Sequence, residues 1–159
     1  MGGDWYVAQV CANGHVISSL LESGGSKSAF CESCGVATTT VCENCGVALR
    51  GRYRSPEGVL ADYVVPAFCY ACGSSFPWTR ERLDAARELV SDMGKLSEKE
   101  KVELSGTFGD LVADTPRTPV AVGRFRRLVE KAGPVAGKAL YSVLVDVASE
   151  AVRKELFGR

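Results

Sequence analysis

The chain has 159 residues, 46% of them hydrophobic, and its 19 basic residues balance its 19 acidic ones, so the formal net charge is zero. This composition is typical of a globular chain with one ordinary domain or two small ones, and it excludes a largely disordered protein. A neutral balance gives no sign of a polyanionic partner, and no apolar run approaches the ~20 residues that a membrane-spanning helix needs.

The first half predicts short strands separated by turns. Residues 5–10 predict a strand that leads into Cys11, and a tight turn follows before His15. Residues 36–41 are rich in Val and Thr and predict a further strand, whereas the Gly24–Ser28 run predicts a flexible hairpin tip.

Seven cysteines and the only histidine form four short pairs within the first 72 residues. The pairs are Cys11/His15, Cys31/Cys34, Cys42/Cys45 and Cys69/Cys72. A Zn²⁺ ion takes four thiolate or imidazole ligands, so these eight ligands predict two tetrahedral zinc sites with none left over. Three pairs share the pattern apolar-Cys-x-x-Cys-Gly, whose glycine permits the sharp turn that directs backbone N–H groups toward the sulfur atoms.

The main alternative is a framework of disulfides. The chain opens Met-Gly-Gly-Asp-Trp, without the pattern of a secretory signal, so we expect a reducing cytoplasm, where paired cysteines act as metal ligands. Seven cysteines would also leave one thiol unpaired. Both predicted sites use four protein ligands and no second histidine is present for acid–base chemistry, so we predict two structural zinc ions and no enzymatic activity.

Two groupings of the pairs satisfy the same ligand set. Sequential grouping places the first two pairs on one ion and the last two on the other, as in zinc ribbons. Cross-braced grouping joins the first pair to the third and the second to the fourth, as in RING-type domains. We favour the sequential grouping because local closure costs less loop entropy.

The second half contains no Cys or His and predicts helices. The boundary falls near residues 76–79, where Thr79 is the expected N-cap of a helix over residues 80–93. Ser97 and Glu100 form the sequence pattern of a capping box at the start of a second helix.

Thr118 with Pro119 is expected to open a third helix, and Gly133 with Pro134 to end it. A fourth helix is expected from Pro134 to about Phe157. Its broad apolar face indicates the centre of a bundle, with a homo-oligomer contact through this C-terminal helix as the alternative.

The predicted fold class is therefore α+β. An N-terminal zinc-stabilised β domain, either a tandem zinc ribbon or a binuclear treble-clef-like fold, occupies residues 1–78, and a small C-terminal helical bundle occupies residues 79–159.

Two basic groupings suggest contacts with phosphate or nucleic acid: Arg50, Arg52 and Arg54, and Arg124, Arg127 and Lys131. The first three alternate, so a regular strand would direct them to one face. The others follow helical spacing. We prefer solvated faces as the interpretation, because residues 1–76 contain four basic against six acidic residues.

Several motifs resemble a bacterial family of uncharacterised zinc-ribbon proteins. They are the opening Trp5–Ile17, the Cys42–Gly46 knuckle, Arg50–Tyr53, Pro66–Cys69, Phe76–Thr79, Asp114–Thr118 and Asp146–Val152. The resemblance extends over nearly the whole chain and implies the zinc fold and a bacterial cytoplasm, but it implies no activity.

Three functions follow from these patterns. The preferred one is a non-enzymatic zinc-binding adaptor that docks onto a protein partner. The others are nucleic-acid binding through the arginine groupings and a RING-like scaffold for a ubiquitin-like conjugation system, which would require cross-braced zincs.

Overall fold

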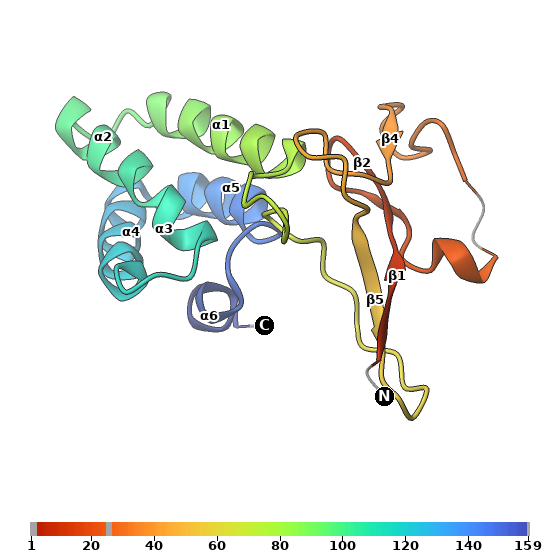
Figure 1. Cartoon of the computed structure of the whole chain (residues 1–159). Coiled ribbons are helices and arrows are strands. Elements are labelled where there is room, and N and C mark those ends of the chain that lie inside the picture. The colour runs from red at the N-terminus through yellow and green to blue at the C-terminus, as the bar shows by residue number, and fades with distance from the viewer. Residues whose placement is uncertain (1–2, 25–26, 159) are drawn as a thin grey trace. The chain divides into compact units, whose positions relative to one another are not determined.

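The computed structural model describes residues 3–24 and 27–158, so Gly25 and Ser26 of the expected hairpin tip lie outside the described residues. The chain divides into two compact units, Met1–Arg80 and Glu81–Arg159. Strands and loops make up most of the first unit and helices make up the second (Figure 1). Within the described ranges, each helix is too short or too polar to span a membrane.

Two small antiparallel sheets organise the first unit. One pairs β1 (Asp4–Val7) with β5 (Arg50–Arg54), and in the other β2 (Gln9–Cys11) lies between β3 (Val16–Ser18) and β4 (Thr38–Thr39). A single 3₁₀ turn, η1 (Leu21–Ser23), follows β3. The strands expected around Cys11 and in residues 36–41 are therefore present, although the first is divided between the two sheets.

The core of the first unit forms around the point where the chain passes from β1 to β2. Ala8 lies at this point, and its N–H donates to the carbonyl of Leu49 at 2.9 Å. Trp78 is 2% exposed, stacks on Phe76 with 4.5 Å between ring centroids, and donates its indole N–H to the carbonyl of Pro66 at 2.8 Å. The indole is thus buried with its one polar group satisfied.

The first long helix, α1 (Pro77–Ser91), begins earlier than the sequence suggested. Thr79 is not its N-cap: the residue lies inside the helix, and its buried hydroxyl donates to the carbonyl of Ala67 at 2.9 Å. Pro77 begins the helix instead, since its fixed φ angle is preorganised for a first helical position.

The next three helices of the second unit are α2 (Glu98–Gly106), α3 (Phe108–Val112) and α4 (Thr118–Ala132). The predicted capping box at the start of α2 is confirmed. The Ser97 hydroxyl accepts from the N–H of Glu100 at 3.3 Å, and the Glu100 carboxylate accepts from the N–H of Ser97 at 2.9 Å.

The prediction of one helix from Pro134 to Phe157 is wrong. The segment forms α5 (Pro134–Leu144), a bend, α6 (Glu150–Val152) and the π-helical turn η2 (Arg153–Phe157). The bend is held at Ser149, whose N–H donates to the carbonyl of Leu111 at 2.9 Å. The apolar residues Leu140, Leu144, Val147 and Val152 of this segment are buried within the structure.

Helices α4 and α5 approach closely at Gly137, where an added Cβ would lie 2.9 Å from Cγ1 of Val129. Gly137→Ala should destabilise the second unit by about 1 kcal/mol, because overpacking costs roughly 1–3 kcal/mol and the better helix propensity of Ala regains about 1 kcal/mol. An added Cβ at Gly123 in α4 would meet open space, so Gly123→Ala is the matched control. It should stabilise the second unit by about 0.5–1 kcal/mol. Urea unfolding followed at 222 nm checks both, and equal stabilisation by the two substitutions would contradict the close contact.

Candidate metal centres

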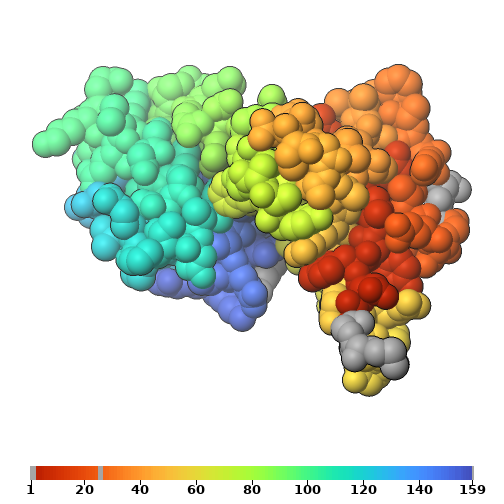
Figure 2. All heavy atoms as spheres, viewed as in Figure 1, coloured from red at the N-terminus to blue at the C-terminus, as the bar shows by residue number. Residues whose placement is uncertain are grey.

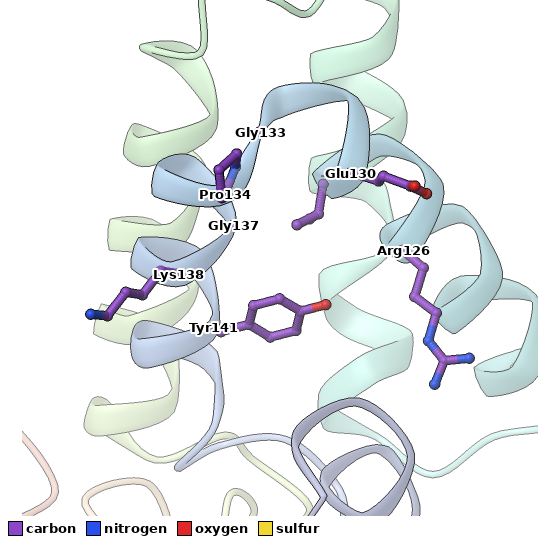
Figure 3. A pocket seen from close by; sticks show the side chains of 8 residues that line it. Arg126, Glu130, Gly133, Pro134, Gly137, Lys138 and Tyr141 are labelled. Atoms are coloured by element: carbon purple, nitrogen blue, oxygen red, sulfur yellow. The ribbon is translucent and has the colours of Figure 1, made fainter.

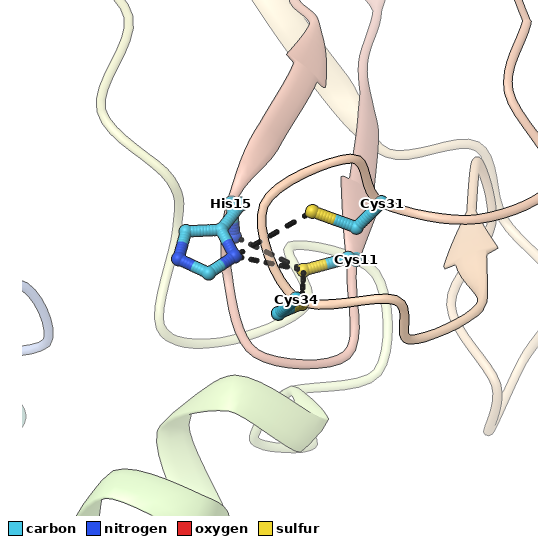
Figure 4. Close-up of side chains that lie close together, drawn as sticks. All are labelled: Cys11, His15, Cys31 and Cys34. Atoms are coloured by element: carbon cyan, nitrogen blue, oxygen red, sulfur yellow. Dashed lines mark hydrogen bonds between the residues drawn. The ribbon is translucent and has the colours of Figure 1, made fainter.

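The first ligand cluster lies between β2 and β3. Cys11 ends β2, His15 precedes β3, and Cys31 and Cys34 come from one knuckle loop (Figure 4). The Sγ atoms of Cys11 and Cys34 are 3.7 Å apart, and the Nδ1 atom of His15 lies 3.5 Å from Sγ of Cys11 and 3.6 Å from Sγ of Cys31. The four ligand atoms therefore surround one point.

The second cluster joins two further knuckles. The Sγ atoms of Cys42 and Cys72 are 3.8 Å apart, as are those of Cys45 and Cys69. Cys42 and Cys69 are buried, whereas Cys45 and Cys72 are exposed, and the two knuckles form neighbouring orange and yellow-green areas of the surface (Figure 2). Within each cluster all ligand atoms lie within 4.8 Å of one another.

These separations match the edges of a tetrahedron around a metal. With Zn–S bonds of about 2.3 Å, tetrahedral sulfur atoms are about 3.8 Å apart, and a sulfur and a nitrogen are about 3.5–3.6 Å apart. A disulfide would require about 2.05 Å, and all seven cysteines are free. Each cluster can therefore hold one metal ion with four protein ligands.

The three Cys-x-x-Cys-Gly knuckles share one backbone geometry. Gly35, Gly46 and Gly73 have φ angles of 71°, 74° and 71°. In each knuckle the glycine N–H donates to the carbonyl of the first cysteine at 2.7–2.9 Å. The N–H of that cysteine donates in turn to the carbonyl of the residue that follows the glycine. The positive φ angle predicted from the sequence is thus confirmed, because only glycine adopts it without strain.

Hydrogen bonds favour the thiolate form of two ligands. Burial acts to raise the pKa of the Cys31 thiol. Hydrogen bonds from the backbone N–H groups of Ser33 and Cys34 outweigh it and lower that pKa to about 6. The hydroxyl of Ser74 and the amide of Asn44 lower the pKa of Cys72 to about 5. Since a metal binds the thiolate, these donors prepare both sulfurs for coordination.

Crowding has the opposite effect on other ligands. Burial raises the pKa of Cys11. At Cys45, the backbone N–H of Val47 acts to lower the pKa, but partial desolvation and hydrogen bonding with the neighbouring thiols outweigh it and raise the pKa to about 12. Closely packed thiols resist ionising together, and a divalent cation at their centre would remove that penalty. A divalent cation at the centre of each cluster would therefore favour the thiolate forms.

The pairs are grouped sequentially, first with second and third with fourth. The cross-braced alternative is therefore wrong, and the RING-like scaffold that required it does not fit this arrangement. The sequential grouping places each ligand set on neighbouring segments of the chain, which costs the least loop entropy.

The three arginines of β5 do not share one face. The register between β1 and β5 shifts between Trp5 and Val7, so one extra residue is accommodated in β5. The guanidinium of Arg50 consequently lies over the ring of Trp5, at 5.1 Å from its centroid, whereas that of Arg54 lies over Tyr6 at 5.5 Å. Trp5 and Tyr6 are consecutive residues of β1 and lie on opposite faces, so the expected arginine stripe is absent.

The second basic grouping is compensated by acidic residues of α2. Arg127 lies 2.5 Å and Arg124 4.0 Å from Oε1 of Glu103, and Lys131 lies 2.6 Å from Oε1 of Glu100. The interpretation as a solvated helix face therefore fits better than a phosphate-binding stripe.

One hollow in each unit was considered as a binding site, and the one in the first unit borders the second ligand cluster, because Cys69 is among its lining residues. In the first unit, a groove of about 340 Å³ is lined by Trp5, Arg50, Tyr53, Phe68 and Tyr70, among others; we call it the aromatic groove. Trp5 and Tyr70 are about half exposed there. The sequence alone does not bring these residues together, because they come from segments far apart in the chain.

In the second unit, an open hollow of about 700 Å³ lies between α4 and α5 (Figure 3). Its lining mixes charges, with Arg126, Glu130 and Lys138 around the ring of Tyr141. Arg126 already lies 3.5 Å from the carboxylate of Glu155. This hollow does not favour one class of ligand.

Comparison with known proteins gives one result for the whole chain. The family described as "Uncharacterized protein conserved in bacteria (DUF2321)" matches residues 4–156. Neither the curated proteins nor the solved structures contain a match.

Proposed function

Because the chain belongs to the bacterial family DUF2321, whose match extends over nearly all of its length, we propose one function for the whole chain. It is a non-enzymatic cytoplasmic adaptor, in which two structural zinc ions stabilise a β domain that docks onto a protein partner. The domain boundary is proposed at residues 78/79, with a helical domain after it.

The donor set supports zinc as the metal. One cluster offers three cysteines and a histidine and the other offers four cysteines, in separations that fit tetrahedral coordination. Thiolate-rich tetrahedral sites are typical of zinc. Knuckles that face each other in sequential pairs also support a tandem zinc ribbon over a treble-clef arrangement.

The number of ligands supports a structural role. A catalytic zinc keeps a coordination position open for water or substrate and commonly has three protein ligands. Here each cluster supplies four, and His15, the only histidine of the chain, is one of them. The zinc ions would therefore hold the loops together rather than act on a substrate.

The observation that carries the docking proposal is the aromatic groove. Phe68 is 40% exposed beside the half-exposed rings of Trp5 and Tyr70, so three aromatic rings that line one groove are open to solvent. Exposed apolar patches rimmed by polar residues mark interaction sites, and aromatic residues are enriched at protein interfaces.

Nucleic-acid binding is the second candidate, favoured by the arginines of β5. Among the described residues, Arg50, Arg52 and Arg54 make no ion pair. However, residues 1–76 carry more acidic than basic side chains, and zinc-bound thiolates would add further negative charge. Phosphate backbones bind surfaces of the opposite sign, so the protein partner is the better-supported choice.

A pull-down from a bacterium that carries this protein tests the proposal. The metal-loaded full chain, cross-linked in a nuclease-treated lysate, should retain one protein in near-stoichiometric amount. Trp5→Ala/Tyr70→Ala should lose it, whereas Phe30→Ala, which removes an even more exposed aromatic ring outside the groove, should keep it. Recovery of no protein would reject the adaptor function.

A further inference from the structure

We propose that the aromatic groove binds an extended peptide segment that presents an acidic side chain next to an apolar one. The inference rests on the proposed docking function and names the chemistry of the partner. It follows from the position and the missing partner of one arginine, and from the apolar walls around it.

Arg50 is the cation of this groove. Its guanidinium carbon lies 3.7 Å from the ring centroid of Tyr70 and 5.1 Å from that of Trp5, so the group is positioned over both rings. Stacking occupies the face of a guanidinium and leaves the N–H groups at its edge free to donate. Two parallel N–H groups at that edge match the two oxygens of a carboxylate.

No acidic side chain of the described residues occupies that edge. Arg124, Arg127 and Lys131 of α4 each lie within 4.0 Å of a glutamate, whereas Arg50 makes no ion pair with any described residue. Asp62 also lines the groove, but it forms no ion pair with Arg50. The groove thus offers a positioned positive charge, and a carboxylate from another molecule is its complement.

The rest of the groove favours an apolar neighbour for that carboxylate. Tyr53, Val64 and Phe68 line it with the two rings that hold Arg50, and its volume falls within the ~300–1,000 Å³ of typical ligand sites. A peptide supplies a carboxylate and an apolar side chain on adjacent residues. A nucleic acid would instead approach with a row of phosphates, which the excess acidic charge of residues 1–76 disfavours.

A random peptide library displayed on phage tests this chemistry on the full metal-loaded chain. Enriched peptides should share Asp or Glu beside an aromatic or aliphatic residue, and one of them, fluorescently labelled, serves as the probe for affinity. Arg50→Gln should weaken its binding by about tenfold or more, because a charge-assisted bidentate contact is lost. Arg54→Gln removes the same charge from the other face of β5, outside the groove, and should leave binding within about twofold.

Metal content and far-UV circular dichroism show whether each variant is folded. Enrichment of basic or uncharged peptides, no enrichment, or equal losses in the two arginine variants would overturn the proposal. Tighter binding of a labelled single-stranded oligonucleotide than of any peptide would overturn it as well. If the pull-down partner is retained by the groove variants, docking stands but occurs elsewhere, so the two proposals fail separately.

Discussion

Removing the metal should unfold the first unit and leave the helices of the second unit in place. Structural zinc contributes about 10–16 kcal/mol in zinc-finger peptides, which is as large as the ~5–15 kcal/mol by which whole domains are stable. The first unit has short strands and a small core, so we expect its loops to depend on metal bound at the two clusters. The helices contain no ligand and have a core of their own.

Elemental analysis of protein purified without chelator should give two zinc ions per chain, and none after chelation. The fluorescence of Trp78 reports on the first unit. When chelation removes the metal, its buried ring should become exposed to solvent and its emission should shift to the red. Trp5→Phe removes the other indole from the signal. The helical signal at 222 nm should largely persist.

Matched variants identify the ligands. Cys34→Ser should reduce the metal content to one ion per chain, whereas Ser33→Ala changes the neighbouring side chain in the same knuckle and should retain two. A metal-free chain that keeps the blue emission of a buried Trp78 would contradict a structural role for the metal.

Features set by neighbouring residues were predictable from the sequence. The ligand pairs occur within knuckles of four or five residues, and the glycine after each second cysteine takes the positive φ angle that its position requires. The capping box of Ser97 and Glu100 is also a contact between residues three apart. In each case one local pattern determines the geometry.

Features set by distant contacts were not predictable. The faces of Arg50 and Arg54 depend on a register shift against β1, some 45 residues earlier in the chain. The C-terminal helix is interrupted where Ser149 bonds to Leu111. The aromatic groove combines β1, β5 and the loop around Tyr70. Periodicity within one segment contains no information about such partners.

Phe125→Ala should remove most of the stability of the second unit. The ring is fully buried in α4, with centroids 6.4 Å from Phe108 and 5.6 Å from Tyr141 in edge-to-face contacts. Truncating a buried Phe costs about 3–5 kcal/mol, which approaches the whole stability of a small domain. Thermal unfolding followed by circular dichroism at 222 nm should show that the helices of this variant unfold at a lower temperature than those of the unsubstituted chain.

Val120→Ala is the matched control, because Val120 lies on the same helix and is 54% exposed. Its effect should remain within about 0.5 kcal/mol, as for most surface substitutions. The Phe125→Ala chain should still bind two metal ions, since the ligands all precede residue 73. Because chelation and this substitution act on different halves, each should leave the other half folded if the two units fold independently. Loss of metal from the Phe125→Ala chain would instead mean that the two units unfold together.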